Sequence, residues 1–191
     1  FERSCERDKA EGCTAAGMLL ATGRGGPQNL TRAAVLLERG CELGDADACH
    51  GAGYLALESP EGADPKRARH LLERACDGGL AEACHDLGVL LGDADGSDAD
   101  REAAFRLHEQ ACEGDYAPGC YAVAYELTQP DAATGADDVR ARKIFADGCA
   151  RDHGASCYGL GLLQLTGRGG EEQPVEAAES FQSGCDLADP N

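Results

Sequence analysis

The cysteines are the residues whose type and spacing carry the clearest chemistry. Eleven occur in 191 residues, and ten of them form pairs whose members are eight positions apart. On one helix such a pair would span about 12 Å, whereas a disulfide needs Cα atoms within about 7 Å. The chain must therefore reverse between the two cysteines, and the glycines in these intervals favour a turn: Gly44, Gly78, Gly79, Gly114 and Gly154. We expect disulfides between Cys5 and Cys13, Cys41 and Cys49, Cys76 and Cys84, Cys112 and Cys120, and Cys149 and Cys157, with Cys185 unpaired.

Free or metal-bound thiols are the alternative to these disulfides. Zinc sites usually separate neighbouring cysteine ligands by about two to four residues, which the wider spacing here does not match. Because disulfides persist in oxidising compartments, the sequence predicts an extracytoplasmic protein in the periplasm, on the cell surface or outside the cell. No apolar run approaches the roughly 18 residues of a transmembrane helix, so we expect no membrane span.

The common catalytic motifs are absent. A Ser-x-x-Lys motif would place a base beside a nucleophile, but Glu6, Ala63 and Arg140 stand three residues before the three lysines. The segment 154–158 ends in tyrosine, so it is not Gly-x-Ser-x-Gly, and His-Glu-x-x-His does not occur. We therefore predict no catalytic residues and no cofactor.

Two groups of side chains raise the question of a metal site. His50 and His85 occupy equivalent positions of neighbouring repeats, which Tyr121 and Tyr158 continue, so a flat, half-buried side chain is a better interpretation than a metal ligand. The aspartate-rich segment 93–100 does not match a calcium loop, because the sixth and twelfth positions lack the glycine and glutamate. Asp98 or Asp100 is expected to cap a helix instead. We predict no metal.

The charge of the chain limits its partners. Thirty-five acidic and 17 basic side chains give a formal net charge of −18. Such a surface repels phosphate backbones, so nucleic acid is not an expected partner, whereas basic peptides, cationic ligands or metal ions are favoured. The alternative is that the acidity only keeps an exported protein soluble.

A repeat of about 36 residues must position these groups. The first cysteines of successive frames are 36, 35, 36, 37 and 36 residues apart, a period typical of stacked helix pairs. An alanine stands eight residues before each first cysteine from Cys41 onward, and the residues four and five positions before that cysteine are mostly apolar, as in an amphipathic helix. These second helices are predicted over 31–43, 65–77, 99–113, 138–151 and 174–187. The helix pairs are predicted over 9–43, 46–77, 81–113, 117–151 and 154–187.

The first helix of each pair is predicted to present a ligand groove. At 100° per residue, the second and ninth positions after the second cysteine point away from the buried side, with the fifth position beside them. The groove residues expected from this count are Tyr54, Glu58, Asp86, Asp93, Tyr125 and Gln129. They would suit an extended, preferably basic, peptide. A solvated face without a dedicated ligand is the alternative.

The sequence predicts one array over residues 1–191, because no shift in composition marks an internal boundary. Phe1 aligns with the last turn of a second helix, and the partner of Cys185 would fall near position 193. We therefore expect a segment of a longer chain that continues beyond Asn191, and a continuation before Phe1 is left open.

These features together resemble a known family. The period, the Cys-[His/Tyr]-x-Leu-Gly-like start of the first helix, the Gly-Arg-Gly-Gly loops and the alanine of the second helix are similar to Sel-one-like repeats (SLR), relatives of tetratricopeptide repeats. The cysteine spacing resembles the bacterial cysteine-rich secreted members. The resemblance implies a right-handed α/α superhelix whose concave face is lined by the first helices. It also implies an adaptor or scaffold, and some cysteine-rich members bind penicillin and hydrolyse β-lactams weakly.

We predict an all-α solenoid of about five disulfide-linked helix-turn-helix repeats that acts as a monomer. Its expected function is a non-enzymatic scaffold that binds a protein or peptide through the concave face. A weak β-lactam-hydrolysing enzyme and a purely structural spacer are the alternatives.

Overall fold

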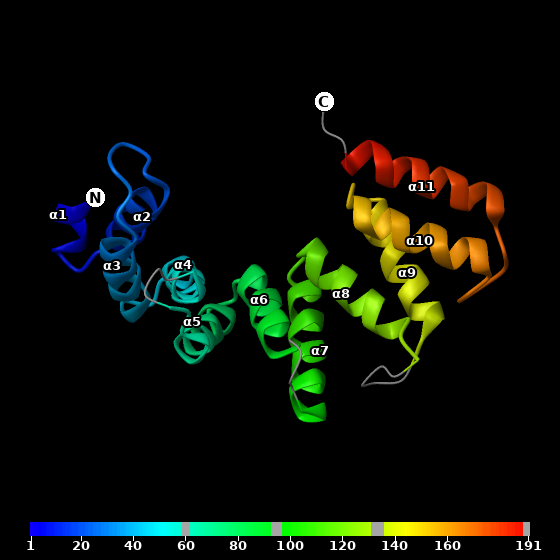
Figure 1. Cartoon of the computed structure of the whole chain (residues 1–191), viewed down its shortest axis with the longest axis horizontal. Helices are drawn as coiled ribbons and strands as arrows, with labels where there is room; N and C mark the ends of the chain where they lie inside the picture. The colour runs from blue at the N-terminus through cyan, green and yellow to red at the C-terminus, as the bar shows by residue number, and fades with distance from the viewer. Residues whose placement is uncertain (59–61, 93–96, 131–135, 189–191) are drawn as a thin grey trace. The chain divides into compact units, whose positions relative to one another are not determined.

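The computed structural model contains eleven helices and no strand among the residues that it describes, which are all except 59–61, 93–96, 131–135 and 189–191. Figure 1 shows the helices in chain order. They are α1 (Glu2–Cys5), α2 (Ala10–Thr22), α3 (Leu30–Glu42), α4 (Ala46–Leu57), α5 (Pro65–Asp77), α6 (Ala81–Gly92), α7 (Asp98–Glu113), α8 (Ala117–Leu127), α9 (Asp138–Cys149), α10 (Gly154–Thr166) and α11 (Pro174–Ala188). The all-α prediction is confirmed.

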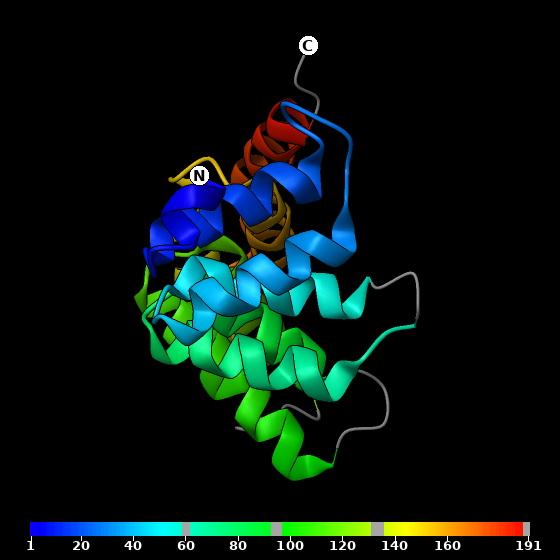
Figure 2. The ribbon, with the colours of Figure 1, turned by 90° about the vertical axis from the view of Figure 1, so that its left-hand side faces the viewer.

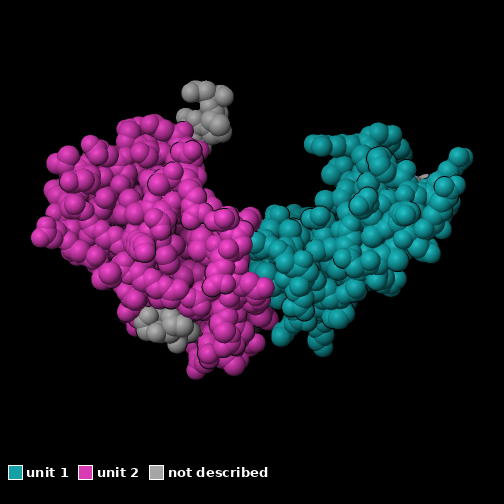
Figure 3. Space-filling model, turned by 180° about the vertical axis from the view of Figure 1, so that it is seen from behind, with its two compact units in different colours: residues 1–90 teal, residues 91–191 magenta. Residues whose placement is uncertain are grey.

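The helices form consecutive pairs. The even-numbered helices from α2 to α10 are the first helices of the repeats, and the odd-numbered helices from α3 to α11 are the second helices. The chain divides into two compact units, residues 1–90 and 91–191 (Figure 3). Within the first unit each helix packs on the next from α1 to α5, and Figure 2 shows this stack. Within the second unit the same holds from α7 to α11.

Short polar side chains define where several helices begin. Asn29, Asp45, Asp64 and Asp137 each accept a hydrogen bond from the backbone N–H three residues later, as N-caps do. The cap of α7 is Ser97 rather than Asp98 or Asp100. Asp100 is the third residue of this helix, and its carboxylate accepts from the Ser97 backbone N–H at 2.9 Å, which completes a capping box.

The reversal between paired cysteines uses one residue with positive φ in every frame. It stands three positions after the first cysteine and is glycine in two frames but aspartate in three: Gly44, Gly79, Asp8, Asp115 and Asp152. Gly114 and Gly154, which the sequence favoured as turn residues, therefore do not supply the left-handed conformation. Aspartate does so because its short polar side chain tolerates that region better than most residues. The turn at Asp152 also ends α9 at Cys149, earlier than position 151.

Five disulfides close these turns. They join Cys5 to Cys13, Cys41 to Cys49, Cys76 to Cys84, Cys112 to Cys120 and Cys149 to Cys157, with Cα–Cα distances of 4.4–4.6 Å. Each bridge fixes the end of one repeat to the start of the next. Cys185 is a free, exposed thiol. Five disulfides indicate an oxidising environment.

Small residues let the two helices of a pair approach closely. A Cβ added at Gly17 would lie 2.6 Å from Cγ of Leu37, and one at Gly161 would lie 2.7 Å from Cε1 of Phe181. The alanines eight residues before the first cysteines are also buried: Ala33, Ala68, Ala104, Ala141 and Ala177. The missing side chains are therefore needed for packing, which offsets the roughly 1 kcal/mol that a mid-helix glycine costs relative to alanine. None of the described helices is long and apolar enough to span a bilayer.

Candidate binding face on the first helices

The residue five positions after each second cysteine is apolar or aromatic and yet exposed. We call these residues the outer row: Met18, Tyr54 and Val89 in the first unit, and Tyr125 and Leu162 in the second unit. Their exposed fractions are 42% to 53%. The fourth residue after the same cysteine is buried against the second helix, so the outer row is the side of the first helix that no partner helix covers. Each unit therefore presents a line of apolar side chains to solvent.

In the first unit, Met18 of the outer row lies against a glycine of the neighbouring first helix. A Cβ added at Gly51 of α4 would lie 3.5 Å from the Sδ atom of Met18 on α2. The same Cβ would also touch Leu37 of α3, at 3.3 Å. Gly51 thus allows Met18 to approach the neighbouring first helix, and the contact there is apolar.

Two carboxylates border this surface. Tyr54 donates a hydrogen bond from its hydroxyl to Oε1 of Glu58, at 2.9 Å. Nε2 of His50 lies 2.7 Å from Oδ2 of Asp86 on the next first helix. The pKa of Tyr54 is raised, first by the hydrogen bond to Glu58 and also by the charges of Glu58 and Asp86. The structure therefore places Glu58 beside Tyr54, and Asp86 beside His50; that these residues form a ligand groove stays a prediction.

The two histidines of the first unit differ in their electrostatics. The hydrogen bond to Asp86 raises the pKa of His50, and the charges of Asp86, Glu82 and Asp47 add to this effect, while burial opposes it. Burial lowers the pKa of His85, although the neighbouring carboxylates oppose this. His50 thus holds Asp86 in place at the edge of the apolar surface.

In the second unit the face is aromatic. Tyr125 is exposed and stacks on Tyr121, with ring centroids 6.2 Å apart. Tyr121 in turn contacts Phe145 and His153, with centroid distances of 5.7 and 5.8 Å. Gln129 lies just after α8 and donates from Nε2 to the Tyr125 carbonyl oxygen at 3.2 Å, so its amide caps the end of the helix. Asp93, the remaining predicted groove residue, lies outside the described residues.

Comparison with known proteins identifies the repeat. The family model described as Sel1 repeat matches residues 10–45, 46–80, 81–116 and 154–189, which is most of the chain. The chain belongs to the Sel1 repeat family. Sel1 repeat proteins are commonly scaffolds for protein interaction. A search of curated protein sequences finds no match.

Solved Sel1 repeat structures share the fold. A protective antigen of uropathogenic Escherichia coli with an SLR fold matches 96% of this chain with a TM-score of 0.85 and 21% identity. A Sel1 repeat protein of Oxalobacter formigenes matches 96% with a TM-score of 0.87 and 16% identity. The chain spans 39% of the first structure and 76% of the second. Cysteine-rich protein B of Helicobacter pylori matches 66% of this chain, and 90% of its own length, with a TM-score of 0.50 and 20% identity.

Among the described residues of the Sel1 repeat array, a serine lies beside a histidine, and the serine is buried. Oγ of Ser156 lies 2.7 Å from Nδ1 of His153, but Ser156 is only 1% exposed and lies where a Cβ at Gly148 would be. A substrate carbonyl cannot reach this hydroxyl without moving the helices. Among the described residues, no group of three or more His, Cys, Asp or Glu side chains could hold a metal ion.

Two polar contacts between successive repeats were not expected from the sequence. Thr14 donates a hydrogen bond to Oδ2 of Asp45, the N-cap of α4, at 2.8 Å. Arg168 binds both carboxylate oxygens of Asp138. The repeat pattern did not predict these contacts, because Asp45 and Asp138 lie at helix starts and Arg168 lies in a loop, and the lengths of these loops vary between repeats.

Proposed function

We propose that this chain is a non-enzymatic scaffold that binds an extended segment of a partner protein along the outer row of a unit, outside the cytoplasm. The observation that carries the proposal is the exposure of five apolar or aromatic side chains at one repeat position. Exposed apolar side chains that recur in line are typical of interaction surfaces, whereas single ones are common on any protein.

The charges favour a basic segment. Glu58 and Asp86 border the outer row of the first unit, and the net charge of the chain is −18. Complementary charge speeds encounter and selects among partners, while the apolar and aromatic side chains contribute most of the affinity. Tyr54 and Tyr125 are the strongest candidates for this role, since tyrosine is enriched among residues that dominate binding energy.

The disulfides support both the mechanism and the compartment. Disulfides that join successive repeats restrict the motion of the helices that carry the outer row. The outer row therefore loses little conformational freedom on binding, which preserves affinity. The same bridges favour the periplasm, the cell surface or the exterior. The scaffold is proposed to act as a monomer.

Panning of a library of random 12-residue peptides against the immobilised chain tests the proposal. A counter-selection uses a variant with serine at all five outer-row positions. Retained peptides should be enriched in arginine, lysine and large apolar residues, and should be lost on this variant. A matched control replaces three exposed valines of the second helices, Val35, Val139 and Val175, by serine and should retain the same peptides. Equal retention by both serine variants would contradict the proposal.

A further inference from the structure

The first helices carry no lysine and no arginine. Over the bounds given above, this holds for each of α2, α4, α6, α8 and α10. All 17 basic side chains of the chain lie on the second helices, on α1 or in loops. The first helices do carry acidic residues, which are Glu11, Asp47, Glu82, Asp86 and Glu126. The first helices of each unit therefore favour a cationic over an anionic ligand.

In the second unit, a stack of side chains holds the exposed ring of Tyr125. Tyr125 is 53% exposed, and its ring centroid lies 6.2 Å from that of Tyr121, with 21° between the ring planes. Tyr121 is half-buried and contacts the rings of Phe145 and His153. Phe145 is itself buried in the core of this unit. The Tyr125 ring therefore rests on a fixed aromatic base, and little ordering is needed before its exposed face binds a ligand.

A glycine on the next first helix leaves this stack uncovered at one position. Gly159 of α10 stands two positions after the second cysteine of its frame, and its equivalent in the first unit is Asp86, whose carboxylate lies against His50. Tyr121 is the equivalent of His50. A Cβ added at Gly159 would lie 2.7 Å from Cε1 of Phe145, the ring that Tyr121 contacts. The position that a carboxylate fills in the first unit is therefore without a side chain in the second unit, where aromatic rings take its place.

A flat aromatic surface on helices that lack positive charge favours one kind of side chain. Arginine stacks its planar, delocalised guanidinium on aromatic rings, and this group is more weakly hydrated than the ammonium of lysine. The negative face of a tyrosine ring attracts a cation placed over it. An apolar side chain would also cover the ring, but it would gain nothing from the acidic first helices. Arginine is thus the occupant that both observations favour.

We propose that Tyr125, supported by Tyr121, is the subsite at which the scaffold binds an arginine side chain of its partner. The guanidinium lies on the exposed face of the Tyr125 ring and extends the stack that Tyr121 begins. This inference rests on the proposed function, because it names the residue of the partner segment that the outer row of the second unit binds. It is also stricter, since it requires arginine where the net charge requires only a basic residue.

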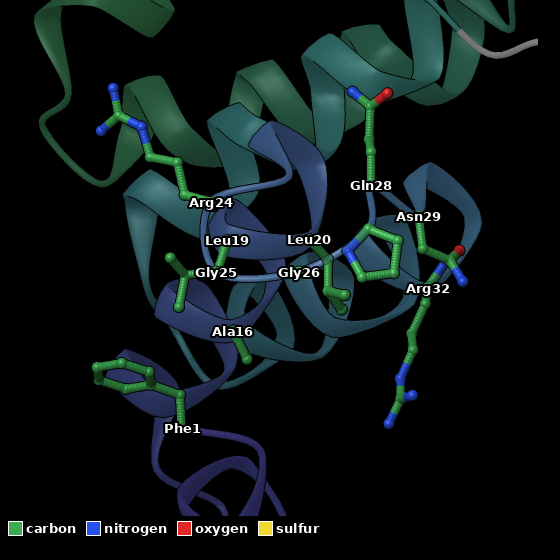
Figure 4. Close-up of a pocket in the computed structure, with 11 residues that line it drawn as sticks. Phe1, Ala16, Leu19, Leu20, Arg24, Gly25, Gly26, Gln28, Asn29 and Arg32 are labelled. Carbon is green, nitrogen blue, oxygen red and sulfur yellow. The ribbon is translucent and has the colours of Figure 1, made fainter.

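A concave surface of the first unit does not suit this ligand. It is a hollow of about 520 Å³, lined by Phe1, Leu19, Leu20, Arg24 and Arg32 among others (Figure 4). Its two arginines disfavour a cationic side chain. The arginine subsite is therefore assigned to the flat surface at Tyr125 and not to this hollow.

Three tripeptides of the form acetyl-Gly-Xaa-Gly-amide test the proposal, with arginine, lysine or citrulline at the centre. Citrulline keeps the planar shape of arginine but is neutral, whereas lysine keeps the charge but is not planar. The chain is labelled with carbon-13 in its tyrosine rings, and each peptide is titrated by NMR. The Tyr125 signals should shift saturably with the arginine peptide, with a dissociation constant about threefold lower than for the lysine or citrulline peptide.

Variants at Tyr125 separate the role of its ring from other effects. Tyr125→Phe keeps an aromatic ring and should bind the arginine peptide within about twofold of the native chain, whereas Tyr125→Leu should lose the preference for arginine. Saturation transfer to the side-chain protons of the peptide measures binding in each variant, and circular dichroism checks that the exposed substitutions leave the fold intact. Tyr158→Leu is the matched control. It removes another exposed tyrosine, whose ring lies against Phe181, and should leave the titration unchanged.

Two results would overturn the proposal. The first is an equal dissociation constant for the arginine, lysine and citrulline peptides at Tyr125. The second is an arginine titration that Tyr125→Leu does not change. Either result can occur while longer peptides from panning still bind along the outer row. Conversely, panning can fail while the arginine peptide binds at Tyr125, because a tripeptide needs only one subsite, so the two failures are distinguishable.

Discussion

Asp86 and His50 lie 36 positions apart in the sequence, and Nε2 of the imidazole is 2.7 Å from Oδ2 of the carboxylate. The separation is one repeat, so this contact joins two successive first helices at the border of the outer row. It depends on pH, because the hydrogen bond to Asp86 raises the pKa of His50.

The pH dependence of stability should reveal this pair. Since the pKa of His50 is higher in the folded than in the unfolded protein, its contribution is fully present below about pH 6.5 and is lost as pH rises through the folded pKa. Asp86→Asn should therefore lower the free energy of unfolding most near pH 6, by about 1 kcal/mol, and less near pH 8. Urea unfolding at both pH values measures this. In a His50→Gln background, Asp86→Asn should lose most of its pH dependence; an unchanged dependence would show that another group is responsible.

A single added methyl group should disrupt the contact between the last two helices. A Cβ at Gly161 would lie 2.7 and 2.8 Å from two carbons of the Phe181 ring. Gly161→Ala should therefore destabilise the chain by about 1–3 kcal/mol in spite of its better helix propensity. Gly92→Ala is the matched control, because its nearest neighbour would be Cβ of Ala104 at 3.8 Å. Thermal unfolding of both variants tests this prediction. Equal unfolding midpoints would contradict the close contact between Gly161 and Phe181.

The thiol count should match the five bridges. Alkylation of the denatured, unreduced chain should modify Cys185 alone, and alkylation after reduction should modify all eleven cysteines. Intact mass measures both counts, and mapping of bridged peptides checks the pairing. Replacement of Cys41 and Cys49 by alanine should cost about 2.5 kcal/mol, from the entropy of so short a loop. Eleven free thiols in the native sample would contradict the oxidising compartment.

A fluorescent penicillin should leave the chain unlabelled. Ser156, which lies beside His153, is buried, and Ser-x-x-Lys does not occur in the sequence. Incubation followed by intact mass should show no acyl adduct. A saturable adduct that disappears in Ser156→Ala would favour a β-lactam-hydrolysing enzyme over a scaffold.

Most of the helical architecture could be predicted from the sequence, because the cysteine period and the buried alanines such as Ala68 repeat together. The second helix over 65–77 has those bounds in the structure. The turn residues were harder to predict. Glycines stood out between the cysteines, but Asp115 and Asp152 adopt the left-handed conformation, and many other aspartates in the chain do not. The right-handed superhelix and the single array stay predictions.

The exposed side of the first helices could be predicted only where the helix continues. Counting 100° per residue placed Tyr54 and Tyr125 correctly on the exposed side of α4 and α8. Gln129 comes after the end of α8 at Leu127, where the helical count no longer applies, and its amide turns back onto the helix. The clamp between Arg168 and Asp138 depends on loop conformation, which no periodicity encodes.

The most direct measurement of the proposed function is a titration of the peptide most enriched by panning against the native chain and two variants. Tyr54→Ser with Tyr125→Ser should weaken binding at least tenfold, since truncation of a central aromatic residue commonly costs about 2 kcal/mol or more. Replacement of Val35, Val139 and Val175 by serine should leave the affinity unchanged. Equal affinity for the tyrosine variant and the native chain would contradict binding along the outer row.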